Sequence, residues 1–136
     1  MLENVIAYVV TAAIFLVLDL LWLSKVAKSF YFSRLGPLLL ERPRLSIAAT
    51  FYALYVIGII IFAVSPALRL GSADHALVYG ALFGFFAYAT YDVTNYATLK
   101  NWSSTVTFVD IAWGTTLTGL SAYLGTLATQ WVLALL

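Results

Sequence analysis

Four long stretches of the chain are apolar at nearly every position, and short polar segments separate them. A hydrocarbon core about 30 Å thick is crossed by about 20 residues of α-helix, and each stretch reaches that length. The pattern therefore predicts four transmembrane helices within one domain that comprises residues 1–136. The expected spans cover residues 4–23, 45–64, 76–99 and 104–127.

The composition supports insertion into a membrane. Hydrophobic residues make up 63% of the chain and charged residues 10%, whereas a soluble domain carries about 25% charged residues. We therefore predict an all-α polytopic membrane protein whose four helices form an antiparallel bundle in a lipid bilayer. After the first span, Phe30–Phe32 lie beside Lys28 and Arg34. This mixture favours a partly amphipathic segment in the headgroup layer, and an ordinary connecting loop is the alternative.

Basic residues lie mainly on one side of the predicted bundle. The first and third loops hold six of the seven Lys and Arg residues, and Arg69 lies on the opposite side. The positive-inside rule therefore predicts that these two loops are cytoplasmic and that both termini lie outside the cytoplasm. Glu3 stands where a signal peptide would carry a basic residue, so we expect the first span to be retained. The net charge of +1 argues against a nucleic-acid partner.

Three aspartates lie inside the predicted spans, one each in the first, third and fourth: Asp19, Asp92 and Asp110. Each lies six to eight residues from the cytoplasmic end of its span, which is roughly 9–12 Å along a helix. The three carboxyls are therefore expected in one layer, around a common space.

Other polar and aromatic side chains share helix faces with these acids. In the third span, residues at i and i+4 spacing extend from Gly80 and Gly84 to Asp92, which predicts close packing followed by a polar site. In the first and fourth spans a tryptophan follows each aspartate by three residues, on the same face. The candidate ligand-binding residues are Asp19, Asp92, Asp110, Asn95, Tyr91, Tyr88, Thr107, Trp22 and Trp113.

No Lys or Arg lies inside the spans to neutralise the acids. The carboxyls therefore hold protons, or a cation sits among them, as in proton relays and cation sites. The alternative is that the polar side chains only tie helices together, through hydrogen bonds worth about 1 kcal/mol or less each.

Three functional hypotheses follow from this pattern. The first is a binding or transport protein for a proton, a metal ion or a cationic small molecule. A metal bound by these carboxylates alone would be a divalent cation such as Mg²⁺, Mn²⁺ or Ca²⁺. The second is a lipid-active membrane enzyme or subunit, although no recognised catalytic motif and no cysteine is present. The third is a structural or accessory subunit. The expected partners are the bilayer, a small cation or lipid ligand, and a second copy in a homo-oligomer.

Short motifs around the aspartates resemble a family of small predicted bacterial membrane proteins described as domain of unknown function 2177. They are Asp19-Leu-Leu-Trp22, Tyr91-Asp92-Val-Thr-Asn95-Tyr-Ala-Thr-Leu and Asp110-Ile-Ala-Trp113-Gly114. The resemblance covers nearly the whole chain and implies a multi-pass protein of the bacterial inner membrane. It implies no activity, so the three hypotheses remain open.

Overall fold

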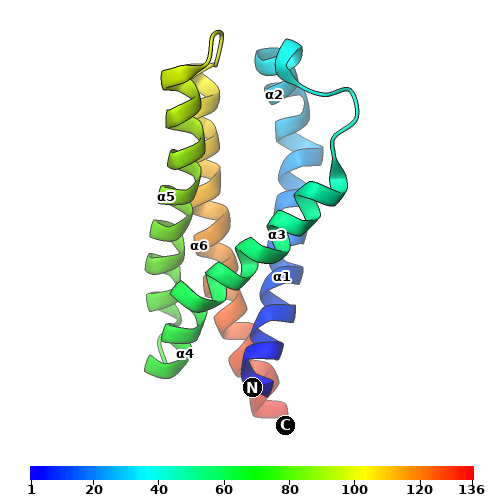
Figure 1. The fold of residues 1–136 in the computed structure, drawn as a ribbon. Coiled ribbons are helices and arrows are strands. Elements are labelled where there is room, and N and C mark those ends of the chain that lie inside the picture. The colour runs from blue at the N-terminus through cyan, green and yellow to red at the C-terminus, as the bar shows by residue number, and fades with distance from the viewer.

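The computed structural model describes residues 1–136 as helices joined by short turns, without a strand. The helices form four rods that run alternately up and down, and both termini lie at the same end (Figure 1). The predicted all-α antiparallel bundle is therefore confirmed. The first rod consists of α1 (Leu2–Trp22), a π-helical turn (Leu23–Ala27) and α2 (Lys28–Leu35); the second of α3 (Leu45–Ile59), a π-helical turn (Ile60–Val64) and α4 (Ser65–Leu70); the third is α5 (Ala73–Thr98) and the fourth α6 (Ser104–Leu135).

Three of the four rods are long and apolar enough to cross a membrane by length and composition: Leu2–Leu38, Leu45–Leu70 and Ala73–Thr98. The fourth rod, α6, is the longest single helix, with 32 residues. Its buried positions include several Thr, Ser and Gly residues, which lower its mean hydropathy and lie on the face that packs against the other helices.

The first rod continues beyond the predicted end of the first span. Its helix passes Lys25 and Lys28 through a π-helical turn and stops only at Leu35, where Gly36–Leu38 form a short 3-10 turn. Proline within that turn cannot donate the next backbone hydrogen bond, which explains why the helix ends there. The segment expected to be an amphipathic loop is therefore helical up to Leu38, and the connection to α3 is short.

Small residues bring α5 and α6 together along their length, and the two helices lie side by side (Figure 1). A methyl group added to Gly84 would lie 2.4 Å from the carbonyl oxygen of Gly114, and one added to Gly80 would lie 2.7 Å from the Cβ of Ala122. Such distances leave no room for a side chain, so the predicted small-residue face of α5 is a close helix contact.

The bundle is tightest near the termini and wider at the α2 end. Near the termini α1 approaches α6 so closely that a Cβ at Gly125 would lie 2.2 Å from the hydroxyl oxygen of Thr11. Toward the other end α1 diverges from α6 and α2 stands apart from α5, while α3 crosses obliquely in front of α1 and α6 in this view (Figure 1). All three aspartates lie in the half of their helix nearer this wider end.

Candidate functional site

Asp92 is a fully buried carboxyl that no hydroxyl or N–H group reaches. On α5 the buried residues Ala76, Gly80 and Gly84 recur every fourth position, and Asp92 continues the same face after Tyr88. The side chain is 0% exposed, and the polar group beside its oxygens is the carboxyl of Asp110. An unpaired buried polar group costs folding free energy, so such a residue is a strong candidate for a functional role.

The carboxyl of Asp110 on α6 lies beside that of Asp92. One of its oxygens accepts a hydrogen bond of 2.8 Å from the hydroxyl of Tyr31 on α2. The indole N–H of Trp22 lies near the same hydroxyl without reaching hydrogen-bonding geometry. The two adjacent carboxyls therefore come from α5 and α6, and α2 supplies the one donor that contacts them.

Asp19 on α1 has partners of its own. Its two oxygens accept hydrogen bonds from the hydroxyl of Tyr52 on α3, at 2.8 Å, and from the indole N–H of Trp113 on α6, at 3.3 Å. The ring of Trp113 stacks on that of Trp22, with centroids 4.5 Å apart and planes inclined by 7°. Asp19 thus links three rods of the bundle and is satisfied without a ligand.

The prediction that all three acids surround one space is therefore corrected to a pair and a separate third residue. No group of three or more Asp, Glu or His side chains is placed to hold a metal ion. The expected divalent-cation site built from Asp19, Asp92 and Asp110 lacks its third carboxylate. Counting residues from a helix end fixes the depth of a side chain, but the direction in which it points depends on helix rotation, which the count does not give.

Two neighbouring cavities adjoin the carboxyl pair. The first has a volume of about 280 Å³, and its wall combines five aromatic residues with one acid: Phe51, Tyr52, Tyr55, Tyr88, Tyr91 and Asp110. The second, about 200 Å³, contains both acids and three aromatic residues: Tyr31, Tyr91, Trp102, Asp92 and Asp110. Tyr91 and Asp110 belong to both, so they form the boundary between the two cavities. The lining residues include no Lys, Arg or His.

The structure separates the other predicted site residues by role. Tyr88 and Tyr91 line the cavity of about 280 Å³. Thr107 is buried but accepts from the indole of Trp102 at 3.1 Å and donates to the carbonyl of Ser103 at 2.9 Å, so it fixes the turn before α6. Asn95 is half-buried and lines neither cavity.

Several residues that complete the cavities were absent from the sequence-based candidates. Tyr52 and Tyr55 belong to the span without charges, and Tyr31 belongs to the segment expected to be a loop. A tyrosine hydroxyl at hydrocarbon depth needs a hydrogen-bond partner, which is a signal the sequence did contain. Tyr52 uses Asp19, and Tyr55 pairs with the hydroxyl of Thr118 at 2.8 Å.

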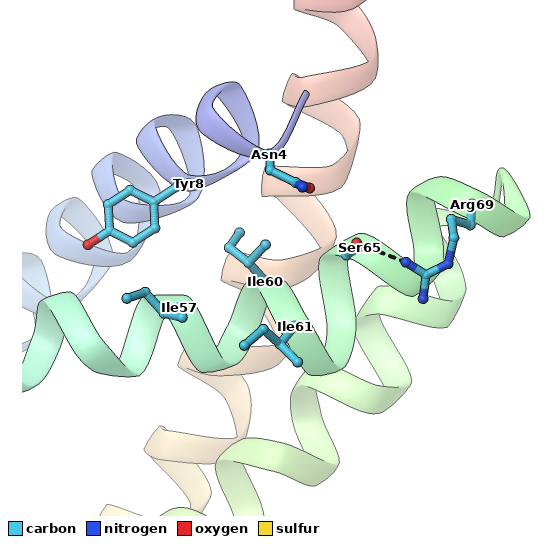
Figure 2. A pocket seen from close by; sticks show the side chains of 7 residues that line it. All are labelled: Asn4, Tyr8, Ile57, Ile60, Ile61, Ser65 and Arg69. Atoms are coloured by element: carbon cyan, nitrogen blue, oxygen red, sulfur yellow. Dashed lines mark hydrogen bonds between the residues drawn. The ribbon is translucent and has the colours of Figure 1, made fainter. Parts of the chain in front are cut away.

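A cavity of about 440 Å³ at the opposite end of the molecule has a different character. Its wall is formed by residues from the start of α1 and from the second rod: Asn4, Tyr8, Ile57, Ile60, Ile61, Ser65 and Arg69 (Figure 2). Arg69 bonds to Ser65, one turn earlier on the same rod, at 3.1 Å. This cavity contains no acid and shares no residue with those beside Asp110.

Comparison with known families agrees with the motifs around the aspartates. The family model described as "Predicted membrane protein (DUF2177)" matches residues 4–127. The chain therefore belongs to this family of predicted membrane proteins. No curated protein and no solved structure matches the sequence.

Proposed function

We propose that this member of the DUF2177 family binds a cationic small molecule in the cavity of about 280 Å³, with Asp110 as the counter-charge. The observation that carries the proposal is the combination of five aromatic side chains and one carboxyl around the same space. Aromatic faces attract cations electrostatically, by about 0.5–2 kcal/mol each, and more strongly where water is excluded. Rings and a carboxylate together are the lining that organic ammonium ions require.

The dimensions of the cavity favour a small organic cation. Its volume lies just below the range of about 300–1,000 Å³ that holds drug-sized ligands. Tetra-alkylammonium ions with short chains suit such a space, because they present a diffuse positive charge and need no hydrogen-bond acceptor. The hydroxyl of Tyr52 is already committed to Asp19, so its ring stays available to the ligand while its position is fixed.

Asp92 gives the proposed site a route to proton coupling. Two neighbouring carboxyls in a space without a basic side chain repel each other when both are ionised, so one proton or one positive ligand is needed between them. Entry of a cation would then release a proton from the pair. Transport driven by a proton gradient is the extension of this exchange, and it requires the binding step first.

Direct binding of tetraethylammonium to the purified protein tests the proposal. By isothermal titration calorimetry, Asp110→Asn should weaken binding at least about tenfold, which corresponds to about 1.4 kcal/mol. Asp74→Asn is the matched control. This exposed acid lies in the first turn of α5, whereas the cavity residues of α5 lie in its second half. Equal affinity of Asp110→Asn and the wild type, or no binding to the wild type, would contradict the proposal.

Proton release can be measured in the same experiment. If binding displaces a proton, the observed enthalpy changes with the ionisation enthalpy of the buffer. This dependence should disappear in Asp92→Asn. An enthalpy that is equally buffer-dependent in the variant would assign the proton to another group.

We further propose that the chain forms one four-span domain of the bacterial inner membrane with both termini outside the cytoplasm. The distribution of basic residues between the loops supports this orientation. The chain has no cysteine, so single cysteines report topology without background. A membrane-impermeant maleimide applied to intact spheroplasts should label Leu70→Cys but leave Ser104→Cys unlabelled until the membrane is permeabilised. The reverse pattern would invert the proposed orientation.

A further inference from the structure

We propose that the groove between the first rod and the segment 38–44 binds an anionic glycerophospholipid, with the phosphate held between Lys28 and Arg44. The groove has a volume of about 760 Å³, which makes it larger than the cavities beside the aspartates. It lies outside the proposed cation site, and its occupation does not depend on that site's function.

The two walls of the groove come from different segments. One wall is a continuous stripe on the first rod, from Leu20 and Leu23 to Lys28 and Phe32. The other wall is the connection from α2 to α3, with Leu38–Leu40 and Arg44. In Figure 1 this connection loops out from the end of α2 and returns to the start of α3. The space thus lies on the outside of the bundle.

The charges along the groove match those of a phospholipid. Lys28 contributes a positive charge from the helical wall and Arg44 another from the opposite wall, while Glu41 contributes one negative charge. The balance is one net positive charge, which complements the single negative charge of a phosphodiester. A basic side chain near a bilayer surface attracts anionic lipid by about 1 kcal/mol, so two such residues supply a measurable preference.

The polarity of the groove changes along the rod as it does along a lipid molecule. Leu20 lies within the apolar stretch of the first span, and Lys28 follows it by eight residues, about 12 Å along a helix. Leu20 and Leu23 are 62% and 41% exposed, so acyl carbons can contact them from the bilayer. The groove therefore extends from hydrocarbon depth to the headgroup level, which suits a lipid better than a soluble anion.

The basic residues of this region provide their own control. Lys25 and Arg42 are exposed neighbours of Lys28 and Arg44 in the sequence, but they do not line the groove. The double variants Lys28→Gln/Arg44→Gln and Lys25→Gln/Arg42→Gln remove the same charge from the same region. Any effect of net charge or of membrane orientation is therefore equal in the two variants, and only a built site distinguishes them.

Native mass spectrometry of the purified protein with phosphatidylglycerol or phosphatidylcholine tests the proposal. The wild type should retain phosphatidylglycerol in preference to phosphatidylcholine. Lys28→Gln/Arg44→Gln should weaken this retention roughly 30-fold, from two contributions of about 1 kcal/mol, whereas Lys25→Gln/Arg42→Gln should change it less than about threefold. Equal losses in the two variants would show non-specific attraction only and overturn the proposal, as would a wild type without preference.

A second pair of variants tests the apolar wall and does not depend on charge. Leu20→Trp places a large ring in the groove and should lower phosphatidylglycerol occupancy, whereas Leu21→Trp, at the next exposed position outside the groove, should not. Glycerol 1-phosphate is the remaining comparison. If it competes as well as the intact lipid does, the groove binds a free phosphate ester and the lipid assignment is wrong.

Discussion

One face of α5 has different surroundings in its two halves. Toward the termini, α5 presents Gly80 and Gly84 to α6, and the backbones approach closely. Toward the α2 end, the ring of Tyr88 packs on Gly114 of α6, and Tyr88 and Asp92 also line cavities. The comparison teaches that one helix face can change from close backbone packing to the wall of a cavity as its side chains become larger.

Disrupting the close contact between α5 and α6 should have the largest effect on stability. Gly84→Ala places a methyl group 2.4 Å from the carbonyl oxygen of Gly114 and 2.7 Å from Thr118, so α5 and α6 must separate. We expect a loss of about 3 kcal/mol in the free energy of unfolding. A denaturation series in mixed micelles measures it. Gly36→Ala is the control, since no atom lies within 4 Å of a Cβ at that position; similar losses for both variants would contradict the close contact.

At the wider α2 end, Asp19→Leu should destabilise the fold, whereas Asp92→Leu should not. It leaves the hydroxyl of Tyr52 and the indole N–H of Trp113 without their acceptor. Unpaired buried donors cost about 1–3 kcal/mol in total stability, so the midpoint of unfolding should fall clearly below that of the wild type. The same denaturation series measures it, and an unchanged midpoint would show that the two hydrogen bonds do not contribute to stability.

Asp92→Leu should change stability in the other direction. The carboxyl of Asp92 is buried beside that of Asp110, and no hydroxyl or N–H group donates to it, so an apolar side chain of similar size removes the cost of burial and the repulsion and should stabilise the fold by about 1 kcal/mol. Tetraethylammonium should still bind to this variant, because Asp110 supplies the counter-charge, but binding should no longer release a proton. Gain of stability with loss of proton release is the expected signature of a functional carboxyl; a loss of stability would identify Asp92 as a structural residue instead.

Two substitutions at Tyr52 should have smaller effects and distinguish the contribution of its ring from that of its hydroxyl. Tyr52→Phe removes the hydrogen bond to Asp19, about 1 kcal/mol of stability, but keeps the aromatic face that lines the cavity. Affinity for tetraethylammonium should therefore stay within about twofold of the wild type, because the cation is attracted by the ring. Calorimetry of Tyr52→Phe beside Tyr52→Ala makes the distinction, and equal affinities in the two variants would exclude the ring from the site.

The smallest effect is expected at Asn95. Asn95→Ala should leave affinity within about twofold of the wild type, because this residue lines neither cavity beside the carboxyl pair. A large loss would place the ligand on a part of α5 beyond both cavities. The measurement is the same titration, with Tyr88→Ala as the positive comparison.

The sequence predicts the fold of this chain better than its site. Apolar length indicates the four rods and the small-residue face of α5, because both depend on local pattern. The division of the acids into Asp19 and the pair Asp92 and Asp110 depends on helix rotation and on partners from distant segments. Tyr31 shows the difficulty: its basic surroundings suggest a loop, whereas the helix continues through it and delivers its hydroxyl to Asp110.

Tyr31 stands in the partition between the proposed lipid groove and the cavity with the carboxyl pair, since it lines both. Its ring forms part of the groove wall beyond Lys28, and its hydroxyl is the donor that covers one oxygen of Asp110. A substitution at Tyr31 would therefore alter the wall of both spaces at once and remove the donor to Asp110.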